Sequence, residues 1–137
     1  MSDASNEQQP YRRRHSQPLA APYLEFDLAR EVEQLHREPE WKTGRNARTL
    51  VKYDSLRVVL TALKAHARIP EHRTEGRISI QTIRGQIQVR AEGRTFELPA
   101  GTLLALDQGL RHDVEALEDS VFLLTISWPV KSDQPAV

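Results

Sequence analysis

From residue 45 onward, short apolar runs alternate with polar breaks along the chain. The runs read TLVKY, SLRVVLTALKA, RISIQTI, QIQVRA, RTFELPA, GTLLALD, HDVEAL and DSVFLLTISW. They are rich in β-branched and aliphatic residues and recur at a spacing of roughly ten residues, which is typical of strands in an all-β domain. The AEGRT stretch between two of them indicates a hairpin. Because no helical pattern separates the runs, the sequence predicts an antiparallel sandwich or barrel.

Two of the runs indicate which strand faces are buried. SLRVVLTALKA is apolar on both faces in its middle, so we expect cover on both sides. That cover would be a second sheet and a helix, or a second subunit, and a homodimer is therefore one expectation. In residues 121–128 the bulky face consists of Phe122, Leu124, Ile126 and Trp128. We expect this bulky face to form core beneath the helix and the smaller, opposite face to line a pocket.

One helix is predicted, over residues 27–38. Asp27 is a suitable N-cap, and Pro39 discourages continuation beyond the last turn. The apolar stripe recurs at i, i+4 and i+7 through Leu28, Val32 and Leu35. His36 lies beside this stripe and is expected on the helix surface. A single stripe on one short helix must pack against a larger element, so we expect the helix to cover part of the β domain.

The chain divides into four segments by composition. Residues 1–22 are polar and punctuated by proline, with too few large aliphatic side chains to offset the entropy of ordering, so they predict a disordered tail. The helix and a connector occupy residues 23–44, the barrel residues 45–130 and a C-terminal tail residues 131–137. The fold class expected is all-β, with one short N-terminal helix.

Composition narrows the range of partners and chemistry. The chain has 137 residues, enough for one domain with a real core. Its 19 basic and 19 acidic side chains balance, so a nucleic acid or an anionic membrane is not expected as the main partner. There is no cysteine, which excludes disulfides, thiolate metal sites and cysteine nucleophiles. No apolar run reaches membrane-spanning length and the start lacks a signal-peptide pattern, so a cytoplasmic location is expected.

The run HDVEA carries a histidine that bears on function. On an extended strand His112, Val114 and Ala116 share one face, while Asp113 and Glu115 share the other. His112 therefore points inward with the apolar residues. An inward histidine after a glycine turn is either a ligand or a core residue with satisfied hydrogen bonds, and the spacing alone leaves both open.

The segment around His112 resembles the second conserved motif of the cupin superfamily, G-x5-P-x-G-x2-H-x3-N. Gly101, Gly109 and His112 fall in register with it. Asp107 stands where proline is usual, and Ala116 where asparagine is usual. The resemblance extends over residues 45–129 and implies a small β-barrel of the jelly-roll type.

An earlier segment resembles the first cupin motif, G-x5-H-x-H-x3-E-x6-G. His72 matches its first histidine and Gly85 its closing glycine. The departures from this motif are His66 at the opening glycine, Thr74 at the second histidine and Ile78 at the glutamate. The first metal motif is therefore degenerate in this chain.

The resemblance implies a metal site, since typical cupins hold Fe, Mn, Ni, Zn or Cu through these histidines and the glutamate. Here it implies His72 and His112 as metal ligands, and His72, Gln81 and His112 as the lining of a ligand pocket. Weaker metal candidates are Glu75, Gln81, Thr74 and His66. His66 also suits a loop, because histidine tolerates positive φ better than most residues. Catalytic residues are not indicated.

Three functions are compatible with these residues. The first is a single-domain cupin that binds a small molecule in its barrel pocket, with or without a weakly held divalent metal. The second is a metal-dependent enzyme of the dioxygenase or isomerase type, for which the missing carboxylate is a difficulty. The third is a sensory or interaction module without metal. Fold resemblance does not choose among them, because function depends on the site.

Overall fold

A computed structural model describes residues 18–129 of the chain. The predicted C-terminal tail and most of the predicted N-terminal tail lie outside this range. The helices of the described part are α2 (Leu28–Arg37) and the 3-10 helix η2 (Pro39–Thr43). None of its helices is long and apolar enough to cross a membrane.

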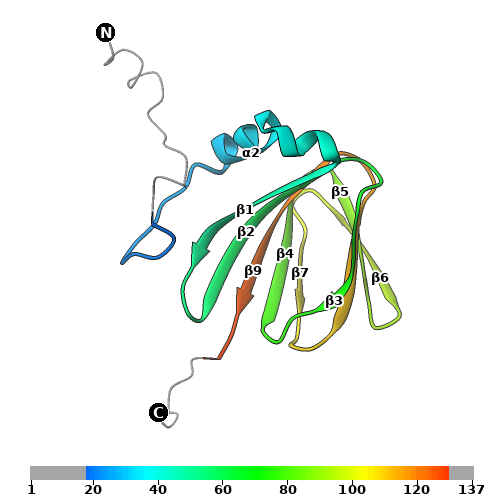
Figure 1. The fold of residues 1–137 in the computed structure, drawn as a ribbon. Coiled ribbons are helices and arrows are strands. Elements are labelled where there is room, and N and C mark those ends of the chain that lie inside the picture. Colours follow the sequence, from blue (N-terminus) through cyan, green and yellow to red (C-terminus); the bar gives the residue numbers. More distant parts are fainter. Residues whose placement is uncertain (1–17, 130–137) are drawn as a thin grey trace.

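Nine strands form in the described part of the chain (Figure 1). They are β1 (Arg45–Lys52), β2 (Leu56–Leu63), β3 (Arg68–Arg73), β4 (Arg77–Arg84), β5 (Gln86–Ala91), β6 (Arg94–Pro99), β7 (Leu103–Leu106), β8 (Arg111–Ala116) and β9 (Ser120–Ser127). All observed pairings are antiparallel. The five-stranded sheet has the order β1-β2-β9-β4-β7 and the four-stranded sheet the order β3-β8-β5-β6.

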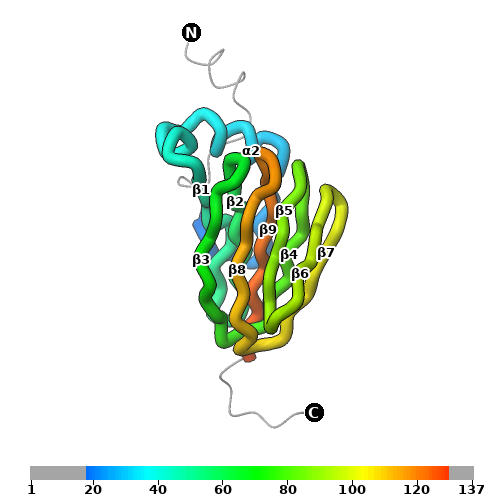
Figure 2. Tube along the Cα trace, turned by 90° about the vertical axis from the view of Figure 1, so that its right-hand side faces the viewer, coloured from blue at the N-terminus to red at the C-terminus, as the bar shows by residue number. Residues whose placement is uncertain are grey.

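The two sheets face each other across a common apolar interior, as the two views show (Figures 1 and 2). Both contribute to one buried cluster, which includes Leu63, Ile80, Ile87, Val89, Leu98 and Phe122. The predicted antiparallel barrel is thereby confirmed. Burial of this cluster supplies the main driving force for closing the barrel.

Helix α2 lies on the outer face of the five-stranded sheet, near one end of the barrel (Figure 1). Its N-cap is Asp27, whose carboxylate accepts a hydrogen bond from the backbone N–H of Arg30 at 3.3 Å. Val32 and Leu35 pack on this outer face in a second buried cluster. Strand β2 contributes Leu60 to the helix side and Leu63 to the barrel interior. The prediction that β2 is covered by a second sheet and the helix is confirmed.

The bulky face of β9 forms core as predicted, but it lies in the barrel interior and not beneath the helix. Phe122 and Ile126 belong to the barrel interior, whereas Val121 belongs to the cluster beneath α2. The interior between two sheets offers more volume than the short contact with one helix, and the bulky face fills it. The smaller face therefore does not line the barrel, as the sequence had suggested.

Strand β3 was not separated from β4 by its sequence pattern. The apolar runs of the sequence include RISIQTI but nothing over residues 68–73, whereas the structure forms β3 over Arg68–Arg73 and starts β4 at Arg77. Strand β3 lies at the edge of its sheet, contains Pro70, and exposes most of its side chains. Proline is tolerated at edges and bulges, and an exposed edge strand shows no apolar alternation from which it could be recognised.

Candidate functional site

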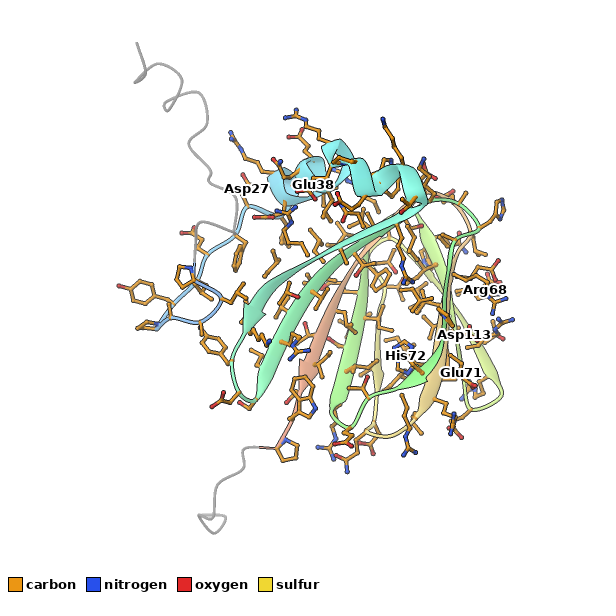
Figure 3. The ribbon with its side chains drawn as sticks, in the orientation of Figure 1. Asp27, Glu38, Arg68, Glu71, His72 and Asp113 are labelled. Atoms are coloured by element: carbon orange, nitrogen blue, oxygen red, sulfur yellow. The ribbon has the colours of Figure 1, made fainter. Side chains whose placement is uncertain are left out.

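His72 and His112 are brought together at one end of the barrel. They are directly opposed in the pairing of β3 with β8, and their ring centroids lie 4.3 Å apart at an interplanar angle of 59°. Figure 3 shows His72 on the inner side of β3, toward the five-stranded sheet. We call the open end of the barrel beside these two rings the mouth. At the mouth, one histidine of the first cupin motif and the histidine of the second therefore lie next to each other.

A β-bulge in β3 creates this histidine pair. Ile69 is opposite Val114 and His72 is opposite His112, so β3 has one residue more than β8 between the two pairs. A regular register would place Glu71 opposite His112 instead. The bulge keeps both Ile69 and His72 on the inner face, and Figure 3 shows Glu71 on the outer side. It therefore selects an imidazole for the mouth and keeps a carboxylate out of it.

Hydrogen bonds fix the same tautomer in both rings. Nδ1 of His72 lies 2.9 Å from the carbonyl oxygen of Pro70, and Nδ1 of His112 lies 3.0 Å from that of Leu110. A carbonyl oxygen only accepts, so each neutral ring carries its proton on Nδ1 and its lone pair on Nε2. Both Nε2 atoms are then acceptors that can receive a hydrogen bond or bind a metal ion.

The two rings differ in their surroundings. His112 is 4 % exposed, whereas His72 is exposed at the mouth. Burial holds the pKa of His112 below its ordinary value, and charge on His72 lowers it further. The bond to the Leu110 carbonyl and the charge of Asp113 oppose this shift without overcoming it. His112 therefore stays neutral in the folded protein at a pH where a free histidine is partly charged.

The depressed pKa of His112 predicts a pH dependence of stability. The unfolded chain takes up a proton near pH 6.5 more readily than the folded chain does, so this contribution to stability is full above that pH. It is lost as the pH falls through 6.5 toward the lower pKa of the folded state. We expect the His112→Gln variant to lose less stability than the wild type between about pH 7.5 and about pH 5.5. Urea unfolding at both pH values measures this, and identical losses would contradict it.

A shallow depression lies beside the histidines. Its lining consists of Thr74, Gly76, Ile78, Leu106, Asp107, Leu110 and His112. It encloses about 130 Å³, including open solvent. The only carboxylate in this lining, that of Asp107, accepts a hydrogen bond from Nε of Arg77 at 2.8 Å. The depression is thus mainly apolar, with the imidazole of His112 at one side.

The remaining candidates from the first motif fall in different places. Thr74 and Ile78 line the depression with His112, whose ring contacts that of His72. The four positions at which the two motifs carry their metal ligands are therefore close together in space. Ile78 is 5 % exposed and presents an apolar side chain where the motif has its glutamate. Glu75 lies exposed in the turn between β3 and β4.

Gln81 and His66 do not lie beside the two histidines. Gln81 is exposed on the outer face of the five-stranded sheet, where it is paired with Leu103 and Leu123. Strand alternation directs it away from the interior-facing Ile80, so it does not share a pocket with His72 and His112. His66 occupies a turn with φ of 73°, and its backbone N–H donates to Ala116 at the other end of β8 from His112. The loop interpretation of His66 agrees with this geometry.

The donor set does not fit a catalytic metal centre. Residues 18–129 contain no group of three or more His, Cys, Asp or Glu side chains placed to hold a metal ion. Non-haem iron chemistry needs three protein ligands, commonly two imidazoles and a carboxylate. The mouth supplies two imidazoles and the Thr74 hydroxyl, while Ile78 supplies no donor. No reaction step is therefore assigned to a metal.

One polar residue of the mouth was missed by sequence reasoning. Arg57 is the second residue of β2 and lies on the same face as Leu63, whose side chain is in the barrel interior. Its guanidinium carbon lies 5.3 Å from the ring centroid of Trp128. The sequence does contain a signal that could have identified Arg57: it is a charged residue on the inward face of an otherwise apolar run.

Two facing antiparallel sheets, with two motif histidines at one mouth, define a small cupin domain. The sequence profile of AraC-like ligand binding domains matches residues 57–129, which is more than half of the chain. The chain belongs to this family. No curated protein matches the sequence.

Three solved structures with the same fold share 15–22% sequence identity with this chain. A conserved protein of unknown function from Streptococcus pyogenes has a TM-score of 0.67 and 20% identity, over 82% of this chain and 93% of that one. KdgF from Halomonas sp. has a TM-score of 0.57 and 22% identity, over 64% and 83%. Salicylate 1,2-dioxygenase from Pseudoaminobacter salicylatoxidans, in adducts with gentisate, has a TM-score of 0.71 and 15% identity. That match covers 80% of this chain but 34% of the dioxygenase.

Proposed function

We propose that this cupin domain binds a small molecule at its mouth, with His72 and His112 in contact with the ligand. The observation that carries the proposal is the pair of adjacent imidazoles, each with Nδ1 bonded to a backbone carbonyl and Nε2 left as an acceptor. The pair places one buried imidazole, that of His112, beside one exposed imidazole, that of His72. It suits a ligand that donates a hydrogen bond to both rings.

Ligand sensing or binding is favoured over catalysis. Membership in a family of ligand binding domains supports it. The dioxygenase neighbour supports an enzymatic role only through a shared fold, at a sequence identity of 15%. A metal-dependent dioxygenase or isomerase would also require a third protein ligand, and Ile78 stands where the motif supplies one. A cupin domain that binds a small molecule therefore agrees better with the residues of the mouth than a metal-dependent enzyme does.

The test is ligand-observed NMR on a mixture of small metabolites. We expect saturation transfer from the wild-type protein to one or more members of the mixture, and its loss in the His72→Ala/His112→Ala variant. The matched control is His66→Asn, which removes a histidine from the opposite end of the barrel and should leave binding intact. Folding of each variant is checked by circular dichroism. Equal transfer from the double variant would overturn the assignment of the two histidines.

Metal content is measured on the same proteins, purified without a polyhistidine tag. A divalent metal held by two imidazoles alone would exchange readily, so we expect less than one equivalent of Fe, Mn, Ni, Zn or Cu by elemental mass spectrometry. One equivalent in the wild type, absent from the double variant, would instead establish a metal centre and favour the enzymatic alternative.

We also propose a homodimer in the cytoplasm. Helix α2 covers the outer face of the five-stranded sheet near one end only (Figure 1). Beyond it Leu103 is 58 % exposed on that face, beside the exposed Ala105. A second copy would cover this apolar area. Sedimentation equilibrium determines the oligomeric state directly.

A further inference from the structure

Arg57 lies on the wall of the mouth that faces the histidines. In the five-stranded sheet one row of paired residues runs across β2, β9, β4 and β7, and its members are Arg57, Ile126, Ile78 and Leu106. In the four-stranded sheet the facing row consists of His72, His112 and Ala91. Ile78 and His112 line the same depression, so the two rows oppose each other. Facing sheets lie roughly 10 Å apart, so side chains of the two rows extend toward each other across this end of the barrel.

The guanidinium of Arg57 has no polar partner among the described residues. Its Nε–H is buried and donates to no acceptor, and the guanidinium lies over the ring of Trp128. Lys52 is directly opposite Arg57 in the pairing of β1 with β2, so a second cation stands beside it. A buried donor without an acceptor and like charges in a cross-strand pair are both unfavourable. An anion bound at Arg57 would relieve both.

We propose that the ligand is a small hydroxycarboxylic acid, with its carboxylate on Arg57 and its hydroxyl directed at the two histidines. The planar guanidinium fork matches a carboxylate in two parallel hydrogen bonds. The Nε2 atoms of His72 and His112 accept hydrogen bonds, so the other end of the ligand must carry a donor. The apolar Ile78 and Ile126 lie between the two polar ends and suit a carbon skeleton. This inference rests on the proposed function, because it names the class of molecule that binds the same mouth.

The experiment compares acids with their neutral amides. Lactate, gamma-hydroxybutyrate and para-hydroxybenzoate are each titrated into the full chain beside the corresponding amide. The signals followed by NMR are Nε–Hε of Arg57, the indole N–H of Trp128 and the imidazoles. We expect saturable shifts at Arg57 and Trp128 with at least one acid and none with its amide. In Arg57→Gln the affinity for that acid should fall by at least about tenfold, and Arg57→Lys should lie between the two because it keeps the charge but loses the fork.

The matched control is Arg77→Gln. Arg77 lies at the same end of the barrel, but its guanidinium is already bonded to Asp107 and is 67% exposed. The control removes one positive charge as Arg57→Gln does, and it should leave acid binding unchanged. Arg57→Gln should also unfold at no lower urea concentration than the wild type, because an unpaired charge beside Lys52 is removed. Lower stability would show that Arg57 serves packing on Trp128.

The possible failures separate the two proposals. Acids and amides that shift the imidazole signals equally, with unchanged affinity in Arg57→Gln, would overturn the role of Arg57 and leave ligand binding at the histidines intact. Acid binding at Arg57 that persists in His72→Ala/His112→Ala would overturn the role of the histidines. The absence of any saturable shift at Arg57 with all the acids would overturn this inference.

Discussion

The Gly85→Ala variant is expected to lose at least about 3 kcal/mol of unfolding free energy. Gly85 has a φ of +78°, in the left-handed region that L side chains rarely adopt. A Cβ there would also overlap the carbonyl oxygen of Asp119 and the hydroxyl of Ser120. That hydroxyl accepts a hydrogen bond from the backbone N–H of Gln86 at 3.0 Å, so the clash would disturb the start of β5 as well. Urea unfolding measures the loss.

Gly101→Ala provides the control for this prediction. Gly101 also has a positive φ, of +90°, but nothing lies within 4 Å of the position that its Cβ would take. Its substitution should cost only the backbone strain, about 1–2 kcal/mol. If the two variants unfold at the same urea concentration, the close approach of the β8–β9 turn to Gly85 is not what requires a glycine there.

Arg48→Met is expected to destabilise the protein by about 3 kcal/mol, because it leaves the largely buried carboxylate of Glu38 without its cation. Arg48 on β1 bonds the carboxylate of Glu38, the C-cap residue of α2, and its side chain is 3% exposed. Asn46 completes the arrangement by donating to the other carboxylate oxygen at 2.9 Å and to the Leu35 carbonyl at 3.0 Å. These groups tie the end of the helix to the sheet.

An exposed ion pair on the same helix tests whether burial is the cause. Arg30 and Asp27 lie 3.4 Å apart with side chains 47% and 49% exposed, so Arg30→Met should cost less than about 1 kcal/mol. Combining Arg48→Met with Glu38→Leu should recover part of the loss, because neither charge is then buried without the other. A double variant that is no more stable than Arg48→Met would contradict this account.

The sequence was sufficient to predict those elements whose hydrophobic residues recur with a simple helical or strand period. Residues 27–38 predicted a helix that the structure places at Leu28–Arg37, and Asp27 caps it as expected. The alternating runs predicted the antiparallel barrel. The pattern could not say which face of β9 fills the barrel, because both faces are apolar and only the neighbouring sheets decide. It also missed β3, because an exposed edge strand containing Pro70 carries no periodic signal.

The candidate site was predicted in part. The motif resemblance named His72 and His112, and their rings do meet across β3 and β8. Gln81 was placed with them, although alternation from Ile80 directs it to the outer face. Arg57 was overlooked because a single charged residue near the start of a strand is usually exposed to solvent. Its inward direction follows only from the register with Ile126.

The bulge in β3 makes the chemistry of the mouth depend on strand register as well as on side-chain identity. One residue separates a register that presents His72 to His112 from one that would present Glu71. A slip of β3 by one residue after Ile69 would exchange an imidazole for a carboxylate without any change of sequence. Strand slippage at a sheet edge disturbs little of the core, so such a change is structurally accessible. Deletion of Pro70 or Glu71 would have the opposite effect, because it removes the bulge and leaves His72 two residues after Ile69, where regular pairing still presents it to His112.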